Sequence, residues 1–137
     1  MNVVYLALGS NLNSPKRQLH LAIKALRKLP KTHLLAIAPL YYNKAQGKRA
    51  QPNFYNTVVK IITTLNPYCL LDHCLQIEKN QERIRKIKWQ ARTLDIDIIL
   101  YATRIIKTPI LQIPHMHFTK RDFVCIPLSA LYKPFLN

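Results

Sequence analysis

The spacing of apolar residues alternates between strand-like and helix-like along this chain, and that order constrains its fold more than any single motif does. Residues 3–8 form a short apolar run typical of a buried strand. Residues 15–29 carry apolar side chains three and four positions apart, which predicts an amphipathic helix. Residues 33–40 and 54–63 again have strand-like composition, and the intervening segment, which contains a glycine and a proline, is predicted to be a long loop.

A second helix and a last long strand complete this order. Asn66 and Pro67 combine a capping side chain with a proline suited to the first helical position, and they predict a helix that runs to about Gln81. Residues 93–101 alternate as a half-buried strand does, and a short turn is expected to lead into a strand at residues 105–108 that pairs with it. The order strand, helix, strand, strand, helix, strand predicts an α+β fold with a ferredoxin-like core, in which helices pack on the faces of an antiparallel sheet.

Capping residues and prolines help to place the helix ends. Ser14 is predicted to cap the first helix, with Pro15 at the first helical position and Pro30 beyond the last turn. A final helix is expected over residues 119–131, interrupted by Pro127. These signals set the expected length of each helix.

Length and composition predict one globular domain. A chain of 137 residues can build one continuous core and is expected to form a single domain over residues 1–137. Its apolar runs are far shorter than the about 20 residues that a membrane-spanning helix needs. The N-terminus enters a strand-like run without the features of a secretion signal, so a cytoplasmic protein with no membrane partner is expected. A monomer is expected because no exposed apolar stripe is left over once the helices and strands are placed.

The charge of the chain points to ligands that carry phosphate. The sequence has 21 Lys and Arg residues against 6 Asp and Glu residues, which gives a formal net charge of +15. A surplus of this size attracts nucleic acids, nucleotides and acidic membranes alike. The arrangement of the charged residues must therefore decide between these ligands.

The cysteines favour packing over metal binding. Cys69, Cys74 and Cys125 form no Cys-x-x-Cys pair, and in a chain without a secretion signal they are expected to be reduced thiols. His73 adjoins Cys74, but no second nearby pair of Cys or His residues completes a zinc site. No structural metal is expected.

The strongest chemical signal is the sequence Asp95-Ile96-Asp97. Side chains two positions apart on a strand leave the same face, so the two carboxylates lie together while Ile96 and Ile98 enter the core. Such a pair suits Mg²⁺, which completes its octahedral shell with water and substrate phosphates. Isolated pairs also occur on ordinary edge strands. In a chain with only 6 acidic residues, however, two adjacent carboxylates repel each other unless a cation lies between them.

A basic segment lies immediately upstream of this pair. Its guanidinium groups can clamp phosphate oxygens, and its indole ring can stack on a base. The residues are Arg83, Arg85, Lys86, Lys88, Trp89 and Arg92. On its own the segment is equally compatible with a nucleic-acid contact. A site for a nucleic-acid backbone gains nothing from two adjacent carboxylates, however, whereas a metal-bridged triphosphate does.

Two further groups of residues offer surfaces for a ring or a phosphate. Phe54 and Asn56 share one strand face and place an aromatic ring beside a bifunctional amide, although a phenylalanine in a strand more often packs in the core. His115, Arg121 and Phe123 form a second group near the C-terminus. Each group alone is a weak signal.

Several of these residues belong to motifs shared with a known family. The motifs are GSNL at 9–12, FYN at 54–56, IE at 77–78, RIR at 83–85, a tryptophan at 89 followed by RTLDIDI at 92–98, and PH at 114–115. Together they resemble the 6-hydroxymethyl-7,8-dihydropterin pyrophosphokinases, and the resemblance covers about residues 3–132. The RTLDIDI segment with its upstream tryptophan is the specific part.

The resemblance implies an activity and a set of site residues. The family transfers a pyrophosphoryl group from ATP to the hydroxymethyl group of the pterin and releases AMP, with two Mg²⁺ ions held by the carboxylates that match Asp95 and Asp97. Arg83 and Arg92 would join these carboxylates in catalysis by gripping the phosphates. The ATP side would comprise Arg83, Arg85, Trp89, Arg92, Ile98, His115 and Arg121. The pterin side would comprise Phe54, Asn56, Trp89, Asp95 and Phe123.

The chain also departs from the family's pattern. The differing residues are Asn43, Lys44, Leu75, Gln90, Ala91, Ile110, Gln112 and Met116. They keep a second interpretation open, in which a catalytically weakened relative acts as a basic nucleic-acid-binding module. The two interpretations differ for Asp95→Ala, which would abolish Mg²⁺-dependent turnover under the first and preserve or strengthen nucleic-acid binding under the second.

Overall fold

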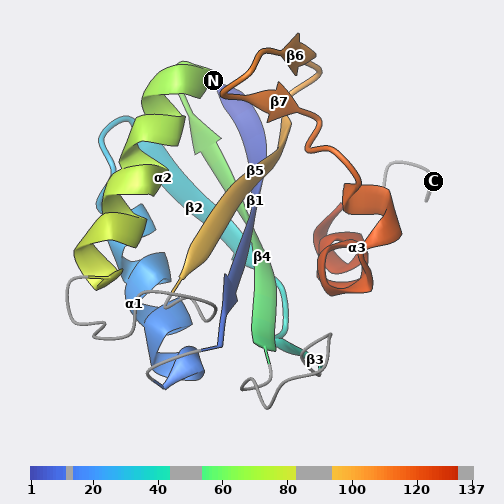
Figure 1. Cartoon of the computed structure of the whole chain (residues 1–137). Helices are drawn as coiled ribbons and strands as arrows, with labels where there is room; N and C mark the ends of the chain where they lie inside the picture. The colour runs from blue at the N-terminus through green and yellow to red at the C-terminus, as the bar shows by residue number, and fades with distance from the viewer. Residues whose placement is uncertain (12–13, 44–53, 83–93, 133–137) are drawn as a thin grey trace.

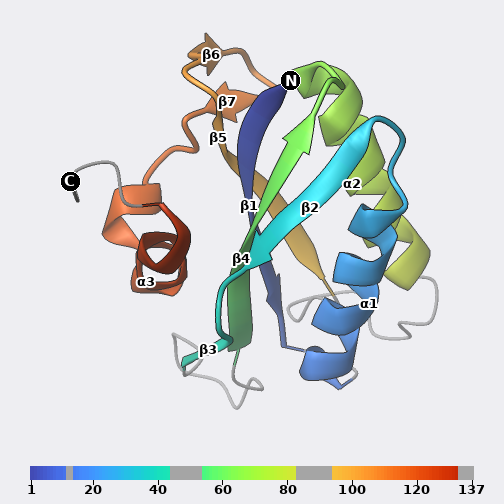
Figure 2. The same cartoon turned by 180° about the vertical axis from the view of Figure 1, so that it is seen from behind.

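The computed structural model describes residues 1–11, 14–43, 54–82 and 94–132, and Figures 1 and 2 show it from two opposite sides. The strands are β1 (Asn2–Ser10), β2 (Thr32–Ile37), β3 (Tyr41–Asn43), β4 (Phe54–Thr63), β5 (Asp95–Tyr101), β6 (Ile106–Lys107) and β7 (Gln112–Ile113). The helices are α1 (Pro15–Arg27), α2 (Pro67–Glu82) and α3 (Asp122–Leu131), and a 3-10 turn, η1 (Phe118–Lys120), precedes α3. Among the described residues, no helix combines the length and apolarity needed to cross a bilayer.

The main sheet confirms the predicted α+β fold. Its strands run in the order β2, β4, β1, β5, and every neighbouring pair is antiparallel. β3 pairs with the beginning of β4. Helices α1 and α2 cover one face of this sheet, whereas α3 lies on the opposite face (Figure 1). This is the ferredoxin-like arrangement, with one helix added on the second face.

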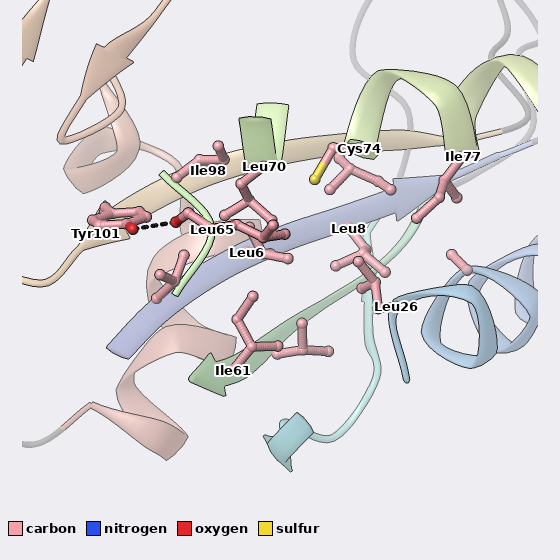
Figure 3. Close-up of a cluster of buried hydrophobic side chains, with 14 of the residues drawn as sticks. Leu6, Leu8, Leu26, Ile61, Leu65, Leu70, Cys74, Ile77, Ile98 and Tyr101 are labelled. Carbon is pink, nitrogen blue, oxygen red and sulfur yellow. Dashed lines mark hydrogen bonds between the residues drawn. The ribbon is translucent and has the colours of Figure 1, made fainter. Parts of the chain in front are cut away.

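The face under α1 and α2 carries the larger hydrophobic cluster. Leu6 of β1 packs with Leu26 of α1 and Leu70 of α2, and all three are fully buried (Figure 3). The Tyr101 hydroxyl donates a hydrogen bond to the Leu65 carbonyl within this cluster, so the buried phenol has a partner. The helical spacing of apolar residues in α1 and α2 therefore serves to close this face of the sheet.

The face under α3 carries a smaller cluster. Tyr5 and Ala7, which alternate with Leu6 along β1, pack with Val58 of β4 and with Val124 and Leu128 of α3. Because successive side chains of β1 point to opposite faces of the sheet, β1 contributes residues to both clusters.

The ends of the two long helices follow different rules. Asn66 caps α2 as predicted, because its Oδ1 accepts a hydrogen bond from the Cys69 N–H at 2.8 Å. The predicted cap at Ser14 is wrong, since its side chain makes no capping hydrogen bond. Ser14 has a left-handed φ of 59°, unlike the extended conformation that turns a capping side chain toward the first helical N–H groups. Its carbonyl still accepts the Gln18 N–H at 3.0 Å.

The chain leaves the main sheet after β5, so the predicted pairing of residues 105–108 with that strand is wrong. Ala102 adopts a left-handed φ of 48°, and its N–H donates to the Val3 carbonyl at 2.7 Å. β6 pairs instead with β7, with Ile106 opposite Ile113. The result is a separate two-stranded hairpin, which lies near the N-terminal end of β1 in Figure 1.

Other boundaries also differ from the sequence prediction. β2 ends at Ile37 rather than residue 40, because Pro39 cannot donate a ladder hydrogen bond. The strand β3 lies in what was predicted to be loop. α3 begins at Asp122 because η1 occupies the preceding residues, and Pro127 lies inside α3 without interrupting it. The Pro127 ring is buried, so packing offsets the loss of its N–H.

The three cysteines are free thiols, as predicted. Cys74 is 1% exposed within the cluster under α1 and α2 (Figure 3). Burial, together with the nearby carboxylates of Glu78 and Asp97, raises the pKa of the Cys74 thiol to about 12. The thiol is therefore protonated at neutral pH and serves packing.

Candidate active site

A cavity of about 280 Å³ opens between the main sheet and α3. We call it the sheet pocket. Its walls come from β1, β4, β5 and the beginning of α3, and they combine two phenylalanine rings with an amide, two carboxylates and a guanidinium group. The lining residues are Ala7, Leu8, Gly9, Phe54, Asn56, Asp95, Asp97, Arg121, Phe123 and Val124.

The register of the sheet aligns the polar groups of the sheet pocket. Gly9 of β1 lies opposite Asn56 of β4 on one side and opposite Asp95 of β5 on the other. Residues that face each other across antiparallel strands project from the same side of the sheet. Asn56 is only 5% exposed, although it is polar. The structure therefore places a buried amide and a carboxylate on either side of a glycine.

The two carboxylates of β5 alternate with buried isoleucines, as predicted. Ile96 and Ile98 belong to the cluster under α1 and α2, whereas Asp95 and Asp97 line the sheet pocket. The Asp97 side chain is 48% exposed, and its Oδ1 lies 3.7 Å from Nε2 of His115. Asp97 is thus within reach of solvent and of an imidazole.

Among the described residues, this pair of carboxylates suits a metal site whose shell is completed by water and substrate. Within the described part of the chain, no three His, Cys, Asp or Glu side chains gather closely enough to enclose a metal ion. A zinc or calcium site built from protein ligands alone is therefore absent from these residues. Mg²⁺ needs only one or two carboxylates when water and phosphate oxygens complete its shell. Asp95 and Asp97, at the open wall of a cavity, meet that requirement.

A second cavity, of about 260 Å³, lies between α2, β5 and the β6–β7 hairpin. We call it the hairpin pocket. Seven of its ten lining residues are apolar, although polar atoms make up more of its surface than apolar ones. The lining residues are Leu71, Ile96, Asp97, Ile98, Pro109, Ile110, Leu111, Gln112, His115 and Met116. Because Asp97 lines both cavities, ligands in the two pockets would meet at this carboxylate.

His115 lies at this junction. Its backbone N–H donates to the Ile99 carbonyl at 3.0 Å, which ties the segment after β7 to β5. Its Nε2 faces Asp97, and its buried Nδ1 has no hydrogen-bond partner among the described residues. The structure therefore brings the predicted histidine and the predicted metal carboxylate together.

The beginning of α3 supplies a cation and an aromatic ring to the sheet pocket. The Arg121 guanidinium lies 5.9 Å from the centroid of the Phe123 ring. The Arg121 carbonyl accepts hydrogen bonds from the N–H groups of Val124 and Cys125, which make the first turn of α3. The helix thus holds both side chains at the wall of the cavity.

Glu78 of α2 has a structural role at the site that its sequence position alone does not reveal. Its Oε2 accepts a hydrogen bond from the Ile96 N–H at 2.6 Å. Ile96 lies between the two carboxylates of β5, so α2 holds the part of the strand that carries them. The sequence signal was the IE motif at residues 77–78, but only the packing of α2 on the sheet shows which group the carboxylate contacts.

Several predicted positions lie outside the described residues. The site residues among them are Arg83, Arg85, Trp89 and Arg92, and the departures from the family's pattern are Lys44, Gln90 and Ala91. Three other departures, Ile110, Gln112 and Met116, line the hairpin pocket. Leu75 is exposed on α2, and Asn43 ends β3. The described departures that line a cavity thus concentrate in the hairpin pocket.

Comparisons with a family model and with individual proteins agree on one family. The family model described as 7,8-dihydro-6-hydroxymethylpterin-pyrophosphokinase (HPPK) matches residues 5–133. A protein of Haemophilus influenzae named 2-amino-4-hydroxy-6-hydroxymethyldihydropteridine pyrophosphokinase is 47% identical over 131 residues, which cover 96% of this chain and 82% of that protein. A protein of the same name from Pseudomonas aeruginosa is 44% identical over 128 residues, which cover 93% of this chain and 79% of that protein.

A longer relative matches over the same region. The folic acid synthesis protein fol1 of Schizosaccharomyces pombe is 36% identical over 129 residues, which cover 94% of this chain and 18% of that protein. The family model spans nearly all of this chain, and two relatives align over most of their own length. The chain therefore belongs to the 7,8-dihydro-6-hydroxymethylpterin-pyrophosphokinase family.

Proposed function

We propose that this chain transfers pyrophosphate from ATP to the hydroxymethyl group of 6-hydroxymethyl-7,8-dihydropterin and releases AMP, as an Mg²⁺-dependent step of folate synthesis. Membership in a pyrophosphokinase family supports the reaction class. The names of the relatives support the pterin as substrate and, in one case, folic acid synthesis as the purpose. The two cavities support this reaction through their separate linings.

The sheet pocket suits a flat heterocycle. Phe54 and Phe123 supply aromatic surface, and the Asn56 amide supplies hydrogen-bond donors and an acceptor. Its volume of about 280 Å³ is close to the lower end of the range of about 300–1,000 Å³ found for small-ligand pockets. We assign the pterin to this pocket.

The hairpin pocket suits the nucleoside part of ATP. Aliphatic side chains such as Leu71 and Ile110 can enclose a base, and the Gln112 amide can hydrogen-bond to its edge. His115 lies toward Asp97 and offers a nitrogen donor to phosphate oxygens. Arg83 completes this assignment as a residue that would grip the phosphates, although it lies outside the described residues.

The observation that carries the proposal is the position of Asp97 in the linings of both pockets. A pterin in one pocket and a triphosphate in the other would direct their reactive groups to the same carboxylate. The hydroxymethyl oxygen attacks the β-phosphorus and forms a new O–P bond, while the bond from that phosphorus to the oxygen of the α-phosphate breaks. AMP leaves with the bonding electrons, and the hydroxyl proton passes to solvent. Positioning of the two substrates therefore supplies most of the catalysis, without a covalent enzyme intermediate.

Asp95 and Asp97 would hold Mg²⁺ at this junction. When bound, the metal would neutralise charge on the triphosphate and make the β-phosphorus more electrophilic. The side chains around the metal have the other roles at this junction. Glu78 holds the strand that carries the carboxylates, and Arg121 brings a permanent positive charge to the wall of the sheet pocket.

The test is the release of AMP from ATP and Mg²⁺, measured with and without 6-hydroxymethyl-7,8-dihydropterin. We expect AMP release that requires the pterin and that Asp97→Ala abolishes. A folded wild-type protein that releases no AMP under these conditions refutes the proposal. Retained nucleic-acid binding by Asp95→Ala in a gel-shift assay would then favour the nucleic-acid-binding interpretation.

A further inference from the structure

We propose that Gly9 is a positioning residue for pterin recognition, because the absence of a side chain there lets the Asn56 amide lie over β1 in the sheet pocket. The proposal rests on the assignment of the pterin to this pocket. It concerns a residue that has no side chain with which to bind the metal or the phosphates. Gly9 affects pterin binding indirectly, because it determines where the side-chain amide of Asn56 lies.

Three residues lie in a row across the sheet at the floor of the pocket. Asn56 of β4 lies opposite Gly9 of β1, and Gly9 lies opposite Asp95 of β5. All three line the sheet pocket. Gly9 therefore occupies the space between the amide and the first metal carboxylate, where a side chain would project toward the bound heterocycle.

The backbone gives no reason for a glycine at this position. Gly9 lies inside β1, is paired on both sides, and does not have the positive φ that favours glycine. Other residues could adopt this extended conformation. Alanine in the middle of a strand is also entropically favoured over glycine by about 0.5–1 kcal/mol. The reason for the glycine is therefore the space beside it.

That space is filled by Asn56. A Cβ atom added to Gly9 would lie 2.6 Å from Asn56 Oδ1 and 3.7 Å from Asn56 Cγ. Nonbonded carbon and oxygen atoms do not approach to 2.6 Å, so the amide would have to rotate away. Asn56 is almost fully buried, and the open space next to it is the sheet pocket. A displaced amide would occupy the volume in which the heterocycle binds, and its donors would no longer point at their partners.

The expected effect of Gly9→Ala depends on which atom moves to relieve the clash. The clash falls on the end of one side chain and not on backbone, so the fold should tolerate alanine. Recognition should suffer, because one or two hydrogen bonds from a neutral amide correspond to about a tenfold change in Kd. Gly9→Ala should thus weaken pterin binding while leaving the melting temperature and the affinity for an ATP analogue close to those of the wild type.

The decisive experiment is a double-mutant cycle on pterin binding. The wild type, Gly9→Ala, Asn56→Ala and the double variant are titrated with 6-hydroxymethyl-7,8-dihydropterin in the presence of Mg²⁺ and a nonhydrolysable ATP analogue. We expect each single variant to bind about tenfold more weakly, and the double variant to bind no more weakly than Asn56→Ala alone. The side-chain amide signals of Asn56 in a ¹H–¹⁵N spectrum, identified by their loss in Asn56→Ala, should shift in ligand-free Gly9→Ala.

Each other outcome has a distinct meaning. An equal penalty for Gly9→Ala in both backgrounds would overturn the inference, because the methyl group would then act without Asn56. A Gly9→Ala protein that does not fold would also overturn it, since the amide would not be the group that yields. A wild type that binds no pterin, or an Asn56→Ala variant that binds it normally, would instead refute the assignment of the pterin to the sheet pocket.

Discussion

The sheet pocket lies on three adjacent strands of the main sheet, β4, β1 and the edge strand β5, whereas the hairpin pocket is closed by a hairpin that pairs with no strand of that sheet. The two pockets also differ in the exposed fraction of some lining side chains. Asn56 in the sheet pocket is 5% exposed, but Ile110 and Met116 in the hairpin pocket are 71% and 48% exposed. The sheet pocket thus contains a buried amide in a fixed register, whereas the hairpin pocket combines the buried Ile96 and Ile98 of β5 with exposed side chains of the hairpin.

The comparison also separates the departures from the family's pattern. Phe54 and Asn56 of the sheet pocket belong to motifs that carry the resemblance, whereas Ile110, Gln112 and Met116 of the hairpin pocket depart from the family's pattern. A buried position in a sheet tolerates few changes because its neighbours are close-packed. An exposed hairpin position tolerates more. We therefore expect substitutions in the two pockets to differ in size and in the substrate whose KM they change.

The largest effect is expected for Asp97→Ala, which removes the carboxylate that both pockets share. Loss of this charge should lower kcat by about a thousandfold, as expected when a metal ligand and its electrostatic stabilisation are lost together. AMP release measured over a range of Mg²⁺ concentrations checks this. Asp72→Ala, on the exposed side of α2, is the matched control and should keep wild-type activity. A loss of less than about tenfold for Asp97→Ala would mean that the shared carboxylate is not the metal site.

A smaller effect, confined to one substrate, is expected for Phe123→Ala. The variant removes an aromatic wall of the sheet pocket, so the KM for the pterin should rise about thirtyfold, which corresponds to about 2 kcal/mol. The KM for ATP should stay within about threefold of the wild-type value. Steady-state kinetics with each substrate varied in turn distinguishes the two constants. Ile126→Ala, exposed on the same helix, should change neither. Equal increases in both KM values would contradict the separation of the pockets.

Glu78→Ala should affect both pockets together, because Glu78 holds the strand between them. The Ile96 N–H loses its 2.6 Å acceptor, and a loss of about 1.4 kcal/mol would lower kcat about tenfold. Glu78→Gln retains a carbonyl oxygen that can accept the same hydrogen bond, so it should recover most of the activity. Comparison of kcat for the two variants tests this. Equal loss in both would show that the negative charge matters and the hydrogen bond does not.

The smallest effect is expected for Met116→Ala in the hairpin pocket. The side chain is half exposed before any ligand binds, so its removal should raise the KM for ATP only about two- to fivefold and leave the KM for the pterin unchanged. Ile105→Ala, exposed near the hairpin but outside the pocket, provides the control. An increase of more than about thirtyfold would show that the hairpin pocket is as closely fitted as the sheet pocket.

Features that depend on neighbouring positions were predictable from the sequence. The alternation around Ile96 and Ile98 identified which side chains of β5 enter the core and which stay at the surface. The Asn66 cap of α2 and the helical spacing in α1 were predicted by the same kind of local rule. The predicted cap at Ser14 failed because the backbone there is left-handed, a choice that its side chain does not dictate.

The sequence by itself therefore determined the order of the four long strands and of α1 and α2, the side chains of β5 that enter the core, and the chemical identity of the groups that suit a metal and a heterocycle. Only the tertiary structure decided that Gly9 separates Asn56 from Asp95 and that Glu78 reaches the backbone of Ile96. The physical reason is the distance along the sequence over which each feature is determined. The period of a strand or helix is set by adjacent residues, whereas register between strands is set by the packing of two hydrophobic clusters whose members lie far apart in the described sequence.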